Sequence, residues 1–570
     1  MGKIKKNKNI FFLFWLTLSF VYISCQNINS AKIEDLKQMK FIKVQNQKLV
    51  TPDGKDFFIK SMAFGNTVWG NPSEEPKYHH TKESYKELKQ LGFNAVRFYI
   101  NYQLFEDDSN PYNYKNTGFD WLNKNIEWAK ENNIYLIVNM HVPQGGFQSL
   151  GNGLSLFSEK ENQKRLVALW KKIADYYKDC STIIGWGLVN EPIVPYIQNN
   201  VKISLEQWHN LAKEISEAIR TVDKNHVLFV ERAIGVISNS TEKKYYSFNE
   251  KDAYPIIEDY NLVYELHSYD PIRYTHQQAS WIPEYSEKIV YPDESKIMIE
   301  QTKYIKESTN HFKEFSSEWK QFYYEINSNY IDTSATNVFQ ISVKPGYLNQ
   351  NGCLYIDDLI LTEIDKNGNE KILKEHDFST EPYWYFGTKD NKSTETATWE
   401  FSDGHNADGC YVIKNTESWA YLTAPENFLI NKDCTYRLSI WMKSNNIKAN
   451  TCYASFGFDL NYAQVATNFT KEFLNQKITS TIQVVKEFNK PIFIGEFGCI
   501  RHCFENNNGG VDYVKDSIEI FKNLTAGFNY HTYHEWNFGL YFSDPTKETP
   551  NKEKINSELV NCFKEFLPKI

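Results

Sequence analysis

A chain of 570 residues is long enough to bury a large hydrophobic core and to form more than one domain. Its formal net charge of −8, with no basic stripe beyond the N-terminus, argues against nucleic acid as the main partner. Aromatic residues make up 16 % of the chain, and their amphipathic rings suit the flat apolar faces of sugars, so composition is a weak signal for a protein that handles carbohydrate.

The N-terminus has the pattern of an export signal. An apolar run over residues 10–23 follows four lysines, Lys3, Lys5, Lys6 and Lys8. The run meets Ser24-Cys25 and resembles a bacterial lipoprotein signal, in which the cysteine becomes the lipidated first residue. It is short for a membrane span. We therefore expect a signal peptide over 1–24, a linker over 25–44 and a membrane anchor at Cys25, with ordinary secretion as the alternative.

Strands and helices alternate from Phe57 onward. Short apolar runs predict six strands, over 57–64, 95–100, 134–140, 183–189, 227–230 and 262–266. Helical periodicity predicts the helices between them, over 81–91, 119–132, 160–177 and 205–222. Because strands that are separated by helices need crossover connections, the six strands should pair in parallel.

The rhythm changes after residue 292. Between 293 and 460 the chain is rich in alternating strands and turn signals, which predicts an inserted β-sandwich. Helical periodicity then returns over 462–488, and further strands and helices follow at 492–495, 513–524, 530–536 and 555–566. Eight strand–helix units predict an α/β fold, a (β/α)8 TIM barrel made of 45–292 and 461–570, with the sandwich inserted between strands six and seven.

Two of the predicted strands lead into a glutamate. The run from Ile183 closes with Asn190-Glu191-Pro192, and Pro192 has no N–H to continue the strand. Far downstream, the run that begins at Pro491 closes with Glu496. The carboxyl ends of parallel barrel strands form one face, so both carboxylates are expected at a common site. Paired carboxylates are the apparatus of glycoside hydrolysis.

At this point the barrel resembles glycoside hydrolase family 5, of the cellulase-like clan of retaining barrel enzymes. The resemblance covers about 45–290 and 461–570. It rests on six motifs: Gly92-Phe93-Asn94-Ala95-Val96-Arg97, Val138-Asn139-Met140-His141, Asn190-Glu191-Pro192, His267-Ser268-Tyr269, Gly495-Glu496-Phe497-Gly498 and Glu535-Trp536-Asn537. Any one residue alone would more often be a cap, an ion-pair partner or core packing. Eight matches at strand ends, in the family's order, favour catalysis.

The resemblance and the chemistry together predict a role for each position. Glu496 suits the nucleophile, held ionised by Arg97 and hydrogen-bonded by Tyr269. Glu191 suits the acid/base. The other positions should contact substrate or orient the two carboxylates, and they are Asn190 toward the sugar 2-hydroxyl, His141, His267, and Trp536 as an apolar floor. This chemistry requires no metal or other cofactor.

Several alternatives stay open. His267-Ser268-Tyr269-Asp270-Pro271 and Thr275-His276-Gln277 resemble cellulase-like members and favour β-1,4-glucan, while mannan, mixed-linkage glucan and xyloglucan are the other candidates. His141, His267 and a glutamate could instead bind a divalent metal for hydrolysis. A non-catalytic sugar-binding lipoprotein is the third class, and the presence of both glutamates argues against it. Cys499 and Cys503 could form a disulfide or stay free thiols.

The segments of the insertion resemble a carbohydrate-binding jelly-roll module in an altered order. A stretch that usually closes such modules, Leu354–Leu359, precedes one that usually opens them, His376–Ser379. This order indicates a circularly permuted sandwich, with two truncated modules as the rival, and we expect strands from both halves to share one two-sheet core. Five tryptophans could offer a sugar platform, although several should be core, and they are Trp319, Trp384, Trp399, Trp419 and Trp441.

Overall fold

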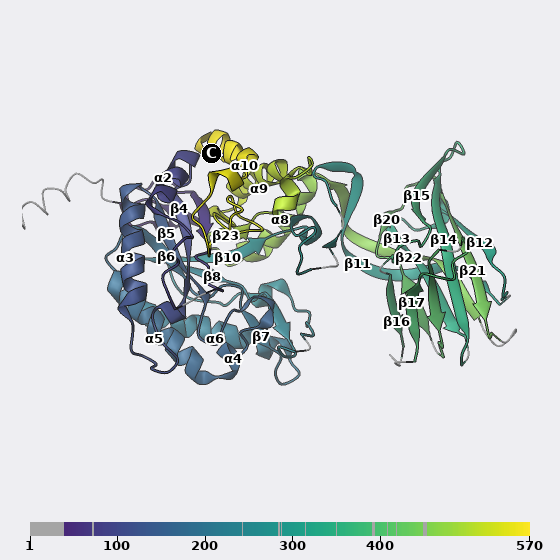
Figure 1. The fold of residues 1–570 in the computed structure, drawn as a ribbon, viewed down its shortest axis with the longest axis horizontal. Helices are drawn as coiled ribbons and strands as arrows, with labels where there is room; N and C mark the ends of the chain where they lie inside the picture. The colour runs from purple at the N-terminus through teal and green to yellow at the C-terminus, as the bar shows by residue number, and fades with distance from the viewer. Residues whose placement is uncertain are drawn as a thin grey trace, which may run out of the picture. The chain divides into compact units, whose positions relative to one another are not determined.

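The computed structural model describes residues 39–569, except for 71–72, 242, 283–284, 287, 314, 349, 383, 390–393, 407, 418 and 448–452. Cys25 and the expected signal peptide lie outside the described residues. The chain folds into two compact units, one that reaches to Pro292 and resumes at Leu474, and one that spans Asp293–Phe473 (Figure 1).

The first unit is a closed barrel of eight parallel strands, as the sequence predicts. In chain order they are β3 (Ile59–Phe64), β4 (Ala95–Asn101), β5 (Tyr135–Val142), β6 (Ile183–Gly187), β8 (Val227–Glu231), β10 (Leu262–Ser268), β23 (Ile492–Phe497) and β24 (Gly527–Tyr530). The last strand pairs with the first, so the sheet has no free edge. The inserted unit leaves the barrel after β10, the sixth strand, and the chain returns before β23, the seventh.

Helices surround the barrel strands, as Figure 1 shows for α3, α5 and α6. The longer ones are α2 (Lys82–Leu91), α3 (Asn116–Glu131), α5 (Lys160–Tyr177), α6 (Val201–Arg220), α8 (Lys471–Lys486), α9 (Gly510–Leu524) and α10 (Ser557–Phe566), and the short ones are α4 (Ser155–Ser158) and α7 (Ile272–Thr275). Helix α2 buries Tyr85, Leu88 and Leu91, the stripe that the sequence predicts. Within the described residues, no helix combines the length and apolarity that a membrane crossing requires.

One end of the barrel is closed by an apolar plug. The hairpin of β1 (Lys43–Gln45) and β2 (Lys48–Val50) contributes Leu49 and the preceding Ile42 to it, and both are buried. They pack against residues at the start of the barrel strands, among them Ile59. Ile42 lies in the predicted linker, so ordered structure begins before the expected boundary at residue 45. The functional face is therefore the opposite, carboxyl end. There, β7 (Ile193–Pro195) and β9 (Gly235–Ile237) form a small parallel sheet beyond β6 and β8.

The eighth strand was predicted in the wrong place. It spans Gly527–Tyr530 rather than 530–536. The segment after it alternates large and polar residues like a strand, but its polar groups turn back onto β3. The N–H of Tyr533 and the hydroxyl of Thr532 both donate to the carbonyl of Ala63, at 3.0 and 2.9 Å. This segment is therefore a loop at the functional end of the barrel.

The second unit is a sandwich of two antiparallel sheets. One sheet contains β11 (Asp293–Phe312), β13 (Val338–Tyr347), β16 (Tyr385–Thr388), β19 (Ala420–Thr423), β20 (Phe428–Leu429) and β22 (Tyr453–Phe469). The other contains β12 (Lys320–Asn327), β14 (Cys353–Ile364), β15 (Glu370–His376), β17 (Thr396–Glu400), β18 (Cys410–Lys414) and β21 (Thr435–Asn445). Strands from both halves of the insertion pair with one another in each sheet, and one buried cluster joins the two sheets.

The insertion ends later than the expected residue 460. Strand β22 continues to Phe469 because its second half pairs with β11, with Tyr462 opposite Lys303 and Asn468 opposite Ile297. The helix predicted over 462–488 therefore begins only at Lys471. Helical periodicity alone could not reveal this, since the partner strand lies about 160 residues earlier in the chain.

Candidate active site

Ionisable and polar side chains gather at the carboxyl ends of the barrel strands. Arg97 and Tyr99 come from β4, Glu265 and His267 from β10, and Glu496 from β23. Asn190 and Glu191 follow β6, and Glu231 ends β8. Most of these groups are almost completely buried, while 20 % of the Glu191 side chain is exposed. This is the face where the sequence places the paired carboxylates.

Glu496 is surrounded by hydrogen-bond donors. Its Oε1 accepts from Arg97 Nη1 at 2.9 Å and from the Tyr99 hydroxyl at 2.6 Å, and its Oε2 accepts from the Tyr269 hydroxyl at 3.0 Å. Burial by itself would raise the pKa of Glu496, but the neighbouring His267 and Arg97 outweigh it and hold that pKa well below its ordinary value. The carboxylate is therefore charged, oriented and partly screened from solvent.

Arg97 connects three elements of the site. Its Nη2 donates to Asn190 Oδ1 at 2.9 Å and pairs with Glu265 Oε1 at 2.8 Å, while Nη1 pairs with Glu496. The guanidinium is fully buried, so loss of a partner would leave an uncompensated charge. Gly495 leaves room for this arrangement, because a Cβ at that position would lie 1.9 Å from Glu265 Oε1.

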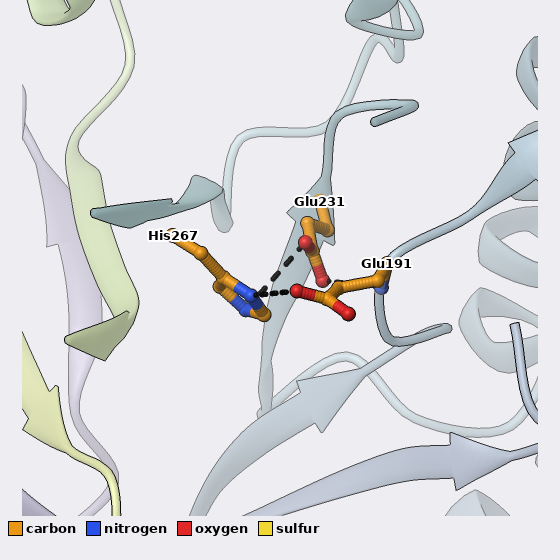
Figure 2. Close-up of side chains that lie close together, drawn as sticks. All are labelled: Glu191, Glu231 and His267. Carbon is orange, nitrogen blue, oxygen red and sulfur yellow. Dashed lines mark hydrogen bonds and ion pairs between the residues drawn. The ribbon is translucent and has the colours of Figure 1, made fainter. Parts of the chain in front are cut away.

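Glu191 is held at its backbone and at both carboxylate oxygens. Its φ of +47° is in the left-handed region, which costs a non-glycine residue ~1–3 kcal/mol. Its N–H donates to Glu231 Oε2 at 2.8 Å, and a hydrogen bond that contributes ~0.5–1.5 kcal/mol offsets part of that strain. His267 Nδ1 donates to Oε1 at 2.9 Å (Figure 2). The Ser149 hydroxyl donates to Oε2.

His267 lies between the two predicted catalytic glutamates. Its Nδ1 is 2.9 Å from Glu191 Oε1 and 3.7 Å from Glu496 Oε2, so these two oxygens are at most about 6.6 Å apart. Retaining glycosidases separate their carboxyl groups by ~5–5.5 Å and inverting ones by ~6.5–9.5 Å. The bound favours the retaining geometry. Burial lowers the pKa of His267, but Glu231 and Glu496 outweigh it and raise that pKa well above its ordinary value.

His141 and Trp536 differ in how closely the structure ties them to this cluster. The His141 ring stacks on Tyr99, with centroids 4.0 Å apart, and burial lowers its pKa well below the ordinary value, so the ring is neutral. Trp536 is 52 % exposed in the loop after β24, and its indole lies under the Arg501 guanidinium at 4.9 Å. Its expected contact with the sugar remains a prediction.

Five residues at the site were missed by sequence reasoning: Tyr99, Ser149, Glu231, Glu265 and His531. Tyr99 lies two positions after Arg97, hence on the same side of its strand, and Glu231 ends an apolar strand as Glu496 does. Tyr99 and Glu231 could therefore have been predicted from the sequence. Ser149 comes from an irregular loop, and His531, 4.0 Å from Glu496, was hidden by the misplaced eighth strand.

Three side chains of the site lie close enough together to be considered as ligands of a metal ion. Glu191, Glu231 and His267 each offer a ligand atom within 4.8 Å of the others. The two carboxylates, however, contact opposite nitrogens of one imidazole, Glu191 at Nδ1 and Glu231 at Nε2. A metal would require that ring to be neutral, and its raised pKa opposes this. The arrangement fits an imidazolium between carboxylates better than a metal site.

Cys499 and Cys503, which follow the strand of Glu496, are buried free thiols, not a disulfide.

Comparison with known proteins adds a family. A family model described as "Cellulase (glycosyl hydrolase family 5)" matches residues 50–320. Endoglucanase C of Acetivibrio thermocellus is 29 % identical over 218 residues, which cover 38 % of this chain and 58 % of that protein. An endoglucanase of Paenibacillus polymyxa is 27 % identical over 247 residues (40 % and 59 %), and a β-xylosidase of Phanerodontia chrysosporium is 28 % identical over 228 residues (34 % and 46 %).

Each alignment spans less than two thirds of the relative's own length. The family match includes Arg97, His141, Glu191 and His267 but ends well before Glu496, which geometry alone brings to the same site. The matched segment, the closed eight-stranded barrel and the paired glutamates at its carboxyl end agree with one another. Over residues 50–320 the chain therefore matches glycosyl hydrolase family 5.

Proposed function

We propose that this protein is a retaining endo-glycosidase that hydrolyses β-1,4-linked glucan, with Glu496 as nucleophile and Glu191 as acid/base. The observation that carries the proposal is the shared contact of His267 with both carboxylates. Glu496 is enclosed by three donors, as a nucleophile requires, while Glu191, which lies near the same nitrogen of His267, is partly exposed.

The geometry supports a double displacement. In the first step Glu496 attacks the anomeric carbon, the glycosidic bond breaks, and Glu191 gives its proton to the departing oxygen. In the second step Glu191, now a carboxylate, takes a proton from water, and the water oxygen displaces Glu496 from the sugar. Net retention follows from two inversions. Donors from Arg97, Tyr99 and Tyr269 hold Glu496 ready before attack and accept its charge again after release.

Asn190 and His141 are proposed to bind the sugar beside these groups. Arg97 Nη2 fixes the Asn190 carbonyl oxygen, which leaves the amide N–H₂ as the donor for a sugar hydroxyl. His141 stacks on Tyr99 and is neutral, so it can donate from one ring nitrogen without adding a competing charge beside Glu496. Trp536 is proposed as the apolar floor of the sugar site.

The assignment of β-1,4-glucan is the finest part of the proposal, and mannan or another β-glucan is the alternative. It is supported by the motifs around His267 and by relatives that carry the name endoglucanase. The experiment is a panel of soluble glucans, mannan, xylan and xyloglucan assayed for new reducing ends. Glu496→Gln should abolish release on every substrate, while Glu106→Gln, at a buried carboxylate outside the site, should keep the wild-type ranking. Highest release on mannan or xylan would overturn the glucan assignment.

For the inserted sandwich we propose carbohydrate binding. Fewer of its tryptophans are exposed for contact with a sugar than the sequence suggests. Trp384 is 7 % exposed in the core, and Trp399 packs against that core with its indole N–H donating to Phe378. Trp419 is 54 % exposed beside Tyr421, with ring centroids 4.8 Å apart, and is the best placed to stack on a sugar. Trp319 and Trp441 are partly buried, and both contact the ring of His405.

We also propose that the protein is exported and anchored through lipid on Cys25, on the basis of the N-terminal sequence pattern. Several acyl chains make such anchoring stable where one chain is marginal. Wild-type protein should fractionate with membranes and Cys25→Ala with the soluble fraction; wild-type protein in the soluble fraction would contradict the anchor.

A further inference from the structure

Glu231 touches the acid/base assembly at two points. It ends strand β8 and is 1 % exposed. Its Oε2 accepts the backbone N–H of Glu191 at 2.8 Å, and its Oε1 lies 3.5 Å from His267 Nε2. Figure 2 shows its carboxylate beside that of Glu191, with the His267 ring facing both. Neither contact is needed to hold β8 in the barrel, because that strand pairs with β6 and β10 through its backbone.

The contact between Glu231 and His267 joins two buried atoms. Glu231 Oε1 and His267 Nε2 are both buried, and neither has a hydrogen-bond partner among the described residues. Each atom lost its water on burial, and its interaction with the other offsets part of that cost. The next carboxylate oxygen, Glu265 Oε1, is farther from the same nitrogen, at 3.9 Å. An imidazole paired with carboxylates on both sides keeps both of its N–H groups, so Nδ1 remains a donor toward Glu191.

We propose that Glu231 is a positioning residue of the reaction, which fixes the backbone of Glu191 and keeps the His267 N–H directed at Glu191 Oε1. This leaves Oε2, the oxygen that Ser149 contacts, as the one that carries the proton to the leaving group. The Ser149 hydroxyl can donate to this oxygen when it is charged and accept from it when it is protonated. The inference rests on the proposed role of Glu191 as acid/base.

A positioning role predicts a selective defect. Misplacement of the acid slows departure of a leaving group that needs a proton, but it does not slow one that leaves as a stable anion. General structural damage would slow both equally. The readout is therefore the ratio of kcat/KM for phenyl β-cellobioside, which needs the proton, to kcat/KM for 2,4-dinitrophenyl β-cellobioside, which does not.

The test variant is Glu231→Gln in the full-length protein. An amide has one oxygen, so it can serve the Glu191 N–H or His267 Nε2 but not both. We expect the phenyl-to-dinitrophenyl ratio to fall by about 10-fold or more, which is within the range that general acid catalysis supplies. The melting temperature should stay within a few degrees of the wild-type value. Glu231→Asp keeps the carboxyl group but withdraws its oxygens by one methylene, and it should show the same loss. Glu106→Gln removes an equally buried carboxylate that binds Arg165 and Gln144, and it should leave the ratio unchanged.

The outcomes separate the two proposals. Glu191→Ala should show the largest fall in the ratio. If Glu191→Ala shows a large fall and folded Glu231→Gln and Glu231→Asp show none, the positioning role is refuted while the acid/base assignment stands. Equal losses on both substrates in the Glu231 variants would also refute it. If Glu191→Ala itself shows no fall, the acid/base assignment fails, and the role of Glu231 fails with it.

Discussion

At the scale of single residues, the site depends on how the charge of Glu496 is maintained. Three donors, one of them the buried Arg97 guanidinium, hold this carboxylate. Its pKa is lowered although the group is buried, because the charges of His267, His531 and Arg97 outweigh the effect of burial. Tyr99 makes the shortest of the three donor contacts, at 2.6 Å. Its hydroxyl is thus part of the electrostatics of the nucleophile and not only a surface for His141 to stack on.

Tyr99→Phe tests this directly. Loss of a donor to the charged form raises the pKa of Glu496, so the acidic limb of kcat/KM should move to higher pH by about one to two pH units, from ~1.5–3 kcal/mol per charged hydrogen bond. The lowered pKa also means that Glu496 stabilises the fold fully above its ordinary value of 4.5, and that this contribution is lost as the pH falls through the folded-state pKa.

Tyr85→Phe is the matched control, because it removes a buried hydroxyl that donates to Asn125 at 2.9 Å outside the site. It should lower stability and leave the acidic limb in place. The measurement is kcat/KM from about pH 3 to 8 together with thermal melts. An unchanged limb in Tyr99→Phe would show that the contact with Glu496 has no electrostatic effect.

At the scale of elements, the barrel strands position the site through close packing between neighbours. Strand β23 carries Gly495 next to the nucleophile, and Glu265 of β10 occupies the space that a side chain there would need. The glycine is required by the neighbouring carboxylate, which in turn binds Arg97.

Gly495→Ala should therefore displace Glu265 and weaken its pair with Arg97. Breaking a buried ion pair costs ~3–5 kcal/mol, so we expect a fall of that order in the free energy of unfolding and loss of most activity. Gly65→Ala, just after β3, places a methyl no closer than 3.4 Å to its nearest neighbour and should cost little. Denaturant unfolding of both variants measures the difference, and equal costs would contradict this account of Gly495.

Most strands and helices of the barrel could be predicted from the sequence, and the exceptions have physical causes. Apolar runs bounded by turns identify seven barrel strands closely, because buried parallel strands are short and continuously apolar. The eighth was misplaced because 530–536 imitates a strand while its polar groups bind the end of β3. Of the site, the sequence identifies the residues that belong to motifs. Ser149 could not be predicted, since its contact depends on the path of an irregular loop.

At the scale of the whole molecule, each unit has a core of its own. In the first unit the core is formed by the apolar plug and the barrel strands, and in the second by the cluster between the two sheets of the sandwich. The insertion leaves and returns through neighbouring strands, since Asp293 at the start of β11 pairs with Phe469 at the end of β22. Paired residues on antiparallel strands lie ~4.5–5.5 Å apart, so a short linker could replace everything between them.

Replacement of 293–469 by a short Gly/Ser linker leaves helix α8 intact and should yield a folded barrel. We expect kcat/KM on soluble β-glucan to stay within about threefold of wild type, because the site residues all come from the barrel. Retention on insoluble glucan, measured by pull-down, should fall. Unchanged retention would contradict a binding role for the sandwich, and an inactive but folded barrel would contradict its independence.

The central claim is that Glu496 attacks the sugar and Glu191 serves as acid and base. Azide rescue with 2,4-dinitrophenyl β-cellobioside, with the product anomer read by proton NMR, tests both roles together. In Glu191→Ala, azide should attack the covalent intermediate and give the β-glycosyl azide. In Glu496→Ala, azide should replace the missing nucleophile and give the α-glycosyl azide. The reverse pairing, or an α-azide from both variants, would contradict the account.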